Sequence, residues 1–146
     1  MERLIAVNGC FDPIHEGHIA LLREASKFGK VVVILKGDKR TSKKKIPLMP
    51  AEERAEILRA IRYVYGVVIY DNDDPNHEDF SEALEILQPA IYCAGADKKN
   101  SQDIPLIYPT CQKLGIVIKY GVGGDKISSS SEILKDYEQR ISETRK

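Results

Sequence analysis

Short apolar runs alternate with longer segments whose apolar residues recur at helical spacing along most of the chain. The short runs are rich in β-branched side chains, as buried strands of a parallel sheet are; they are residues 4–7, 31–35, 67–70, 90–93 and 116–120. The helical pattern covers residues 17–28, 50–61, 77–87 and 104–114, and a last helix is predicted after the serines at 128–131. The polar and basic stretch at 36–45 is predicted to be a loop.

This alternation of strands and helices predicts βαβ units. We therefore expect an α/β fold, a single Rossmann-like domain with a five-stranded parallel sheet and helices on both faces. Residues 1–140 are predicted to form this domain, and residues 141–146 a charged C-terminal tail that frays. Ligands of open parallel sheets bind beyond the carboxyl ends of the strands. Residues that directly follow each predicted strand are therefore the first candidates for chemistry.

The charges of the chain are balanced, with 22 lysines and arginines against 22 aspartates and glutamates in 146 residues. This balance argues against a general affinity for nucleic acid, which requires an excess of positive charge. No apolar stretch approaches the roughly 18–20 residues of a membrane helix, and residues 1–7 lack the pattern of a signal peptide. The three cysteines form no CxxC pair. We therefore expect a cytoplasmic protein with reduced thiols that binds neither nucleic acid nor membrane.

The segment after the first predicted strand, residues 9–18, reads GCFDPIHEGH. His15 and His18 lie at the entry to a helix, where free N–H groups and the helix dipole favour phosphate. Imidazoles can donate hydrogen bonds to phosphate oxygens, and Gly17 allows a phosphate close to the backbone. Two alternatives are an ordinary polar pair at a helix start and a metal site, although a third metal ligand is not obvious nearby.

The segment after the fifth predicted strand, residues 121–133, reads GVGGDKISSSSEI. Glycines followed by a row of hydroxyls at a helix start indicate a second anion site, and Lys126 adds a positive charge. The alternative is a plain serine N-cap after a flexible loop. The basic stretch at 36–45 is either solvated or folded over a triphosphate. A Walker A motif is lacking, as is a GxGxxG after the first strand, which disfavours P-loop ATPases and dinucleotide-binding domains.

These residues carry a resemblance to a known family. Gly9-Cys10-Phe11-Asp12 with His15-Glu16-Gly17-His18 resembles the GxFD…HxGH signature of the cytidylyltransferase-like nucleotidyltransferases, and ISSS at 127–130 resembles their second signature. The same motifs are similar to elements of class I aminoacyl-tRNA synthetases, but this chain is too short to include a tRNA-binding domain as well. Segments 46–54, 73–75 and 95–97 are most similar to the adenylyltransferases that activate heptose 1-phosphate.

The resemblance implies transfer of a nucleoside monophosphate from an NTP, with ATP favoured, to a phosphorylated sugar or polyol, with release of pyrophosphate. Residues 62–64 are similar to the RYVD string of CTP:glycerol-3-phosphate cytidylyltransferases, which leaves that activity as an alternative. Three departures weaken it, namely Tyr65 at the RYVD aspartate, no tryptophan after Asp97, and Gly123-Gly124 where an arginine is usual. Pyridine-nucleotide or FAD-type adenylyltransferase is another alternative, and a nucleotide-binding module without catalysis is one from a different class.

The resemblance also implies roles for particular residues. Those implied to be catalytic are His15, His18, Lys45 and Lys126, with Lys43 or Lys44 as alternatives to Lys45. Those implied to bind the nucleotide are Gly9, Cys10, Phe11, Gly17, His18, Gly95, Asp97, Ser129 and Ser130, and those near the acceptor are Cys10 and Asp12. We expect Mg²⁺ to be carried by the NTP rather than by protein ligands. We also expect a homodimer, with a contact around residues 62–65.

Overall fold

The computed structural model of the protein describes residues 3–72, 76, 78–125 and 129–145. A five-stranded sheet lies at its centre, and all neighbouring strands run parallel in the order β3-β2-β1-β4-β5. The strands are β1 (Leu4–Gly9), β2 (Lys30–Lys36), β3 (Val64–Tyr70), β4 (Ile91–Cys93) and β5 (Val117–Lys119). The first strand along the chain is therefore the middle strand of the sheet, and the chain order reverses on either side of it. Ligand sites of such sheets form at this reversal.

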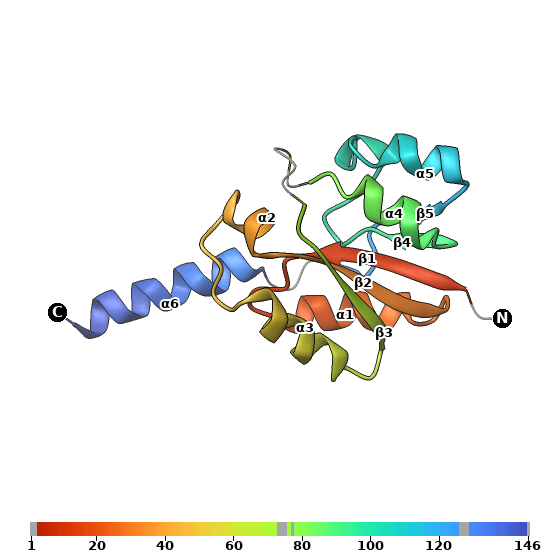
Figure 1. The fold of residues 1–146 in the computed structure, drawn as a ribbon. Helices are drawn as coiled ribbons and strands as arrows, with labels where there is room; N and C mark the ends of the chain where they lie inside the picture. The colour runs from red at the N-terminus through yellow and green to blue at the C-terminus, as the bar shows by residue number, and fades with distance from the viewer. Residues whose placement is uncertain (1–2, 73–75, 77, 126–128, 146) are drawn as a thin grey trace.

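Helices cover both faces of the sheet (Figure 1). They are α1 (Glu16–Ala25), α2 (Asp38–Ser42), α3 (Ala51–Arg59), α4 (Ser81–Leu87), α5 (Tyr108–Leu114) and α6 (Ser130–Thr144), with a 3₁₀ turn at Ser101–Asp103. The predicted fold, a parallel five-stranded sheet between layers of helices, is confirmed. Two helices are shorter than predicted. Those expected to begin at about residues 77 and 104 begin at Ser81 (α4) and at Tyr108 (α5).

The sheet separates two apolar clusters. Because successive side chains of a strand point to opposite faces, Ile5 and Val7 of β1 pack with α1 and α3, whereas Ala6 packs with α4 and α5. All three side chains are fully buried. The apolar runs of the sequence thus have partners on both faces, which explains why they lack an alternating polar pattern.

The stretch at 36–45 differs from the predicted loop, because β2 continues to Lys36 and α2 follows it. Arg40 and Thr41 are fully buried in α2. The Arg40 guanidinium donates hydrogen bonds to the side chain of Asn72 and to the carbonyl oxygen of Asp79. A polar side chain can be buried when its donors are paired in this way, and composition alone does not reveal such partners.

Helix α6 extends away from the sheet and carries the C-terminus (Figure 1), and none of its described residues is buried. It continues to Thr144, so most of the segment predicted as a tail is helical, while the division of the chain at residue 140 stays a prediction. Of the helices in the described ranges, none, α6 included, combines the length and apolar character needed to cross a membrane.

Candidate functional site

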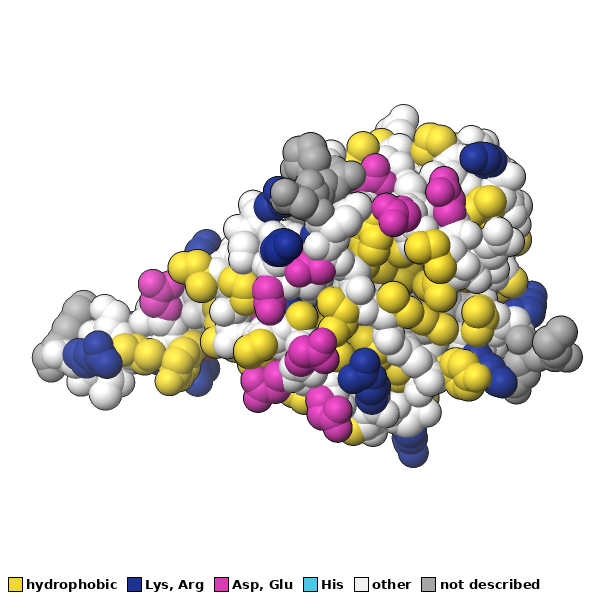
Figure 2. Space-filling view, viewed as in Figure 1, with side chains coloured by type: hydrophobic (Ala, Val, Ile, Leu, Met, Phe, Trp, Pro, Cys, Tyr) yellow, Lys and Arg dark blue, Asp and Glu magenta, His cyan; other side chains and the backbone are white. Residues whose placement is uncertain are grey.

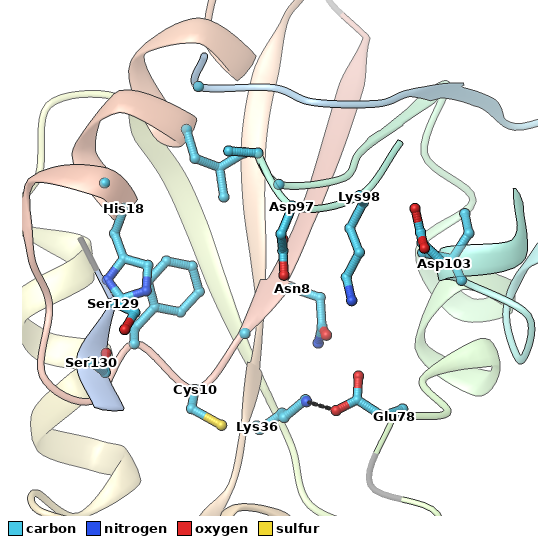
Figure 3. Close-up of a pocket in the computed structure, with 18 of the residues that line it drawn as sticks. Asn8, Cys10, His18, Lys36, Glu78, Asp97, Lys98, Asp103, Ser129 and Ser130 are labelled. Atoms are coloured by element: carbon cyan, nitrogen blue, oxygen red, sulfur yellow. Dashed lines mark hydrogen bonds and ion pairs between the residues drawn. The ribbon is translucent and has the colours of Figure 1, made fainter. Parts of the chain in front are cut away.

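A cavity of about 670 Å³ opens where the strands end (Figure 3). Its lining comes from the ends of β1, β2 and β4 and from the starts of α1 and α6. It includes the predicted residues Gly9, Cys10, Phe11, His15, Gly17, His18, Lys45, Gly95, Asp97, Ser129 and Ser130. The structure thus brings these residues together at one place, at the reversal of strand order where a ligand is expected. Their individual roles stay predictions.

A direct contact joins the two loops that sequence motifs single out. The Ser130 hydroxyl donates a hydrogen bond of 2.9 Å to the carbonyl oxygen of Pro13. Ser129 is the N-cap of α6, and its hydroxyl accepts from the Glu132 N–H at 3.1 Å. The predicted alternative of a serine cap therefore describes Ser129, which nevertheless also lines the cavity. Lys126 lies outside the described residues.

The glycine-rich segment before α6 packs tightly against α1. The Gly123 N–H donates to the Glu24 carboxylate at 2.6 Å. Gly123 has φ +101°, and a Cβ there would lie 3.1 Å from the Leu21 backbone nitrogen. A side chain is therefore excluded both by backbone conformation and by space. This N–H serves the packing of the loop, although the sequence suggested that N–H groups of the loop would bind an anion.

The two histidines form a reciprocal cap at the start of α1. Nδ1 of His15 accepts from the Gly17 N–H at 3.0 Å, and Nδ1 of His18 accepts from the His15 N–H at 3.3 Å. The two rings stack with centroids 3.8 Å apart. Because Nδ1 is the acceptor in each ring, the neutral imidazole carries its proton on Nε2. Each histidine thus has an N–H donor on the ring nitrogen that the cap does not use.

His18 is held in its neutral form. Burial is the largest cause, and the nearby His15 and Lys45 add to it; together they lower the pKa of His18 to about 3. At neutral pH the ring is therefore an uncharged donor, suited to a phosphate oxygen without proton transfer. The alternative of ordinary helix-start residues is correct as far as the cap is concerned, but it leaves the Nε2–H group in the cavity unexplained.

Phe11 supports this arrangement from beside the histidine ring. It adopts a left-handed backbone conformation with φ +50°, and its side chain is buried. Its ring lies 4.6 Å from the His18 ring, centroid to centroid. A Cβ on Gly9 would approach the Phe11 ring to 3.0 Å. Gly9 therefore allows Phe11 to fold back over the end of β1 and hold His18 in place.

Asp12, which was predicted to lie near the acceptor, has its carboxylate hydrogen-bonded inside the fold. It is fully buried and is not among the residues that line the cavity. Its carboxylate accepts from the backbone N–H groups of Leu48 at 2.6 Å and Met49 at 3.1 Å. Its carbonyl oxygen accepts from the Lys45 ammonium. Both carboxylate oxygens thus accept a hydrogen bond inside the fold, where they anchor the segment between α2 and α3, and the carbonyl of the same residue positions Lys45.

Two basic residues to which the sequence assigned no individual role shape the site. Lys36, the last residue of β2, lines the cavity. Arg54 is fully buried on α3, and its Nη1 donates to the carbonyl oxygens of Cys10 at 2.8 Å and Lys36 at 2.9 Å. Arg54 therefore ties together the ends of β1 and β2. A charged residue that ends an apolar strand was a signal for Lys36, whereas Arg54 resembled any residue of a helix's first turn.

Of the three neighbouring lysines that are candidates for a phosphate contact, Lys44 and Lys45 line the cavity, whereas Lys43 is not among its lining residues. Which of them contacts phosphate stays a prediction. Within the residues that the structure describes, His, Cys, Asp and Glu form no group of three or more that could hold a metal ion. The cavity thus gathers imidazole donors, lysines and hydroxyls at the edge of a parallel sheet in an α/β domain, and these are groups that can bind phosphate.

The chain belongs to the Cytidylyltransferase-like family, because the model of that family matches residues 6–139. This confirms the family that the two signatures indicated. The bifunctional protein HldE of Geobacter sulfurreducens is 38% identical in an alignment of 106 residues that covers 66% of this chain and 19% of that protein. The FAD synthase of Pyrococcus abyssi is 41% identical in an alignment of 97 residues that covers 64% of this chain and 63% of that protein. The chain thus spans about a fifth of the length of that HldE protein.

The same fold occurs in solved structures. The lipopolysaccharide core biosynthesis protein from Thermoplasma volcanium superposes with a TM-score of 0.66 at 24% identity, covering 82% of this chain and 94% of that one. At this level of identity the likeness concerns the fold, and it agrees with the single parallel-sheet domain described above.

Proposed function

We propose that this domain transfers a nucleoside monophosphate from an NTP, with ATP favoured, to a phosphorylated sugar or polyol. One observation carries the proposal. The contact between Ser130 and Pro13 joins residues 9–18, the histidine loop, to the serines at 128–131, the serine row, and residues of both line a single cavity. In the reaction, an oxygen of the acceptor phosphate bonds to the α-phosphorus. The bond from that phosphorus to the bridging oxygen breaks, and pyrophosphate leaves with the electron pair. The acceptor is already ionised, so positioning and charge stabilisation suffice.

The proposed roles follow the geometry. The Nε2–H groups of His15 and His18 donate to the α-phosphate as negative charge develops there, and their caps support this by orienting the rings. Lys44, Lys45 and the hydroxyls of Ser129 and Ser130 hold the remaining phosphates, with Lys126 as a further cation from the sequence motif. Mg²⁺ enters as part of the NTP substrate and neutralises charge between its phosphate oxygens.

The choice of nucleotide and acceptor rests on relatives. Similarity to HldE proteins and to the adenylyltransferases of heptose 1-phosphate favours ATP and a sugar phosphate. The FAD synthase similarity supports a second candidate, transfer of AMP to a flavin phosphate. The CTP:glycerol-3-phosphate alternative has no comparable support in these relatives.

A screen for pyrophosphate release tests the proposal. Each of the four NTPs with Mg²⁺ is combined with sugar phosphates, polyol phosphates, FMN and nicotinamide mononucleotide. We expect release with ATP and one acceptor class, and its loss in His18→Asn. A nucleotide-binding module would instead show nucleotide-dependent melting shifts without pyrophosphate in any combination, and that result would refute the proposed activity.

We also propose a homodimer formed through the free edge of β3. Hydrophobic side chains gather on the face over β3, between α3 and α4 (Figure 2). Tyr65 is 63% exposed and Val68 38% exposed on this edge strand, and such an edge needs cover. Sedimentation of the protein and of Tyr65→Lys would test this, because only the variant should be a monomer.

A cytoplasmic location is proposed as well, since Cys10, Cys93 and Cys111 are free thiols.

A further inference from the structure

A buried lysine lies in the cavity apart from the groups assigned to the nucleotide. The Lys36 side chain is only 6% exposed, and its Nζ lies 3.3 Å from Oε1 of Glu78. The Glu78 side chain is 47% exposed and lines the same cavity. Taking an ammonium out of water costs free energy, and a half-exposed carboxylate recovers only part of it. A ligand in the cavity explains this position better than stability does.

Lys36 and Glu78 lie across Cys10 from the histidine and the serines that are assigned to the nucleotide. Strand β2, which ends at Lys36, borders β1 on the side opposite to β4. In Figure 3, His18, Ser129 and Ser130 stand on one side of Cys10, and the Lys36–Glu78 pair stands on the other. The shared contact of Arg54 with the carbonyls of Cys10 and Lys36 places these two residues next to each other. A nucleotide bound beside Gly95, Asp97 and Ser129 leaves the Lys36 side for the acceptor.

The chemistry of the pair matches hydroxyl groups. An ammonium has three N–H donors, and among the described residues Glu78 uses one of those of Lys36. A hydroxyl can accept from the ammonium and donate to the carboxylate, so two neighbouring hydroxyls complement both members. The ammonium of Lys36 and the carboxylate of Glu78 bring one charge of each sign to this part of the cavity. Such balanced charge suits an uncharged polyol chain better than a second phosphate.

We propose that Lys36 and Glu78 bind neighbouring hydroxyls on the carbon chain of the acceptor, so that the site selects sugar or polyol phosphates over alkyl phosphates. This inference rests on the proposed nucleotidyl transfer. It makes the pair a specificity element that acts on the acceptor, while the histidines act on the reacting phosphate.

The first test compares kinetic constants for the acceptor that the pyrophosphate screen identifies. Lys36→Met keeps the aliphatic stem and removes the charge, and Glu78→Gln keeps the shape of a half-exposed side chain. Each should raise the acceptor KM about 10- to 100-fold, the effect of losing a hydrogen bond to a charged group, and leave the ATP KM within about twofold. Lys39→Met is the matched control, because Lys39 is exposed on α2 and does not line the cavity.

The second test asks whether hydroxyls are what the pair recognises. Glycerol 3-phosphate and propyl phosphate are compared as inhibitors, or as substrates, of the wild type and of both variants. The wild type should prefer glycerol 3-phosphate about tenfold or more, and the preference should vanish in Lys36→Met and Glu78→Gln. If the pair had only a structural role, the two substitutions would weaken the binding of glycerol 3-phosphate and of propyl phosphate equally.

The outcomes separate the two proposals. A wild type that releases no pyrophosphate in any combination counts against the proposed function. An active wild type overturns the present inference alone if it binds propyl phosphate as tightly as glycerol 3-phosphate. The same holds if both variants fold, as judged by thermal melting, and keep the wild-type acceptor KM.

Discussion

The clearest test of the site separates the two nitrogens of His18. Nδ1 accepts from the His15 N–H and belongs to the helix cap, whereas Nε2 carries the donor proposed to contact the α-phosphate. In His18→Asn, the carboxamide oxygen can take the place of Nδ1, while nothing replaces Nε2–H. In His18→Gln, the longer side chain brings an amide N–H closer to the position of Nε2 but gives up the cap.

The magnitudes follow from these contacts. Loss of one preorganised donor to a transition-state oxygen lowers turnover by about 10²–10³, so His18→Asn should show that loss in kcat. Loss of ring stacking on His15 and Phe11 costs about 0.5–1.5 kcal/mol. For a domain of this size, such a change shifts Tm by only a few degrees, roughly 2–4 °C per kcal/mol. His18→Asn should thus remain folded but turn over poorly.

The assay is steady-state release of pyrophosphate at saturating MgATP and acceptor, with thermal melting of each variant as the control. His18→Gln should retain more turnover than His18→Asn although it melts lower, because it keeps a donor and loses a cap worth about 1 kcal/mol. Turnover near that of the wild type in His18→Asn would remove this residue from the mechanism. Equal turnover of the two variants would show that Nε2–H is not the group that matters.

Three more predictions test the surroundings of the site. Between pH 6.5 and about 3 the unfolded chain binds a proton at His18 that the folded state excludes, so the free energy of unfolding should fall as the pH falls through this window. Urea titrations at pH 7 and pH 4 measure this loss of stability. The loss in His18→Asn should be smaller than that in the wild type by on the order of a few kcal/mol. Asp12→Asn should lower the free energy of unfolding by about 1.5–3 kcal/mol, because the carboxylate accepts two backbone N–H groups, and an unchanged urea midpoint would refute its anchoring role. Arg54→Lys should lower the free energy of unfolding by about 3–5 kcal/mol, since an ammonium cannot reach the carbonyls of Cys10 and Lys36 and the Asp38 carboxylate together. Guanidinium denaturation would measure this change, and wild-type stability of the variant would mean that the contacts are dispensable.

Much of the site could be located from the sequence because its chemistry lies in short segments of the chain. The histidine loop and the serine row each follow an apolar run, and a parallel sheet brings the ends of such runs to one edge. The contact of Ser130 with Pro13 shows that the two loops meet. The contacts of Asp12 could not be predicted, because a motif shows that a carboxylate is present but not which way it points or which N–H groups it meets.

Contacts between residues that are far apart in the chain could not be predicted either, because the sequence does not show which side chains meet in the fold. Lys36 and Glu78 are 42 residues apart, and neither has a neighbour in sequence that indicates the other. Arg40 in α2 belongs to a basic stretch that was predicted to be a loop, either solvated or folded over a triphosphate, although its side chain is fully buried against the segment that follows β3. Charge patterns record composition, whereas burial depends on which distant backbone carbonyls lie within hydrogen-bond distance.

The sequence by itself determined the succession of strands and helices, the two phosphate-type loops and the family to which they belong. These are properties of short segments, set by side-chain periodicity and by residues that a helix start requires. Only the tertiary structure decided the order of the strands, the proton position on each imidazole, and which charged side chains face the cavity rather than the core. Each of these depends on atoms that are brought together from distant parts of the chain, and packing selects one such arrangement only when all of them are in place.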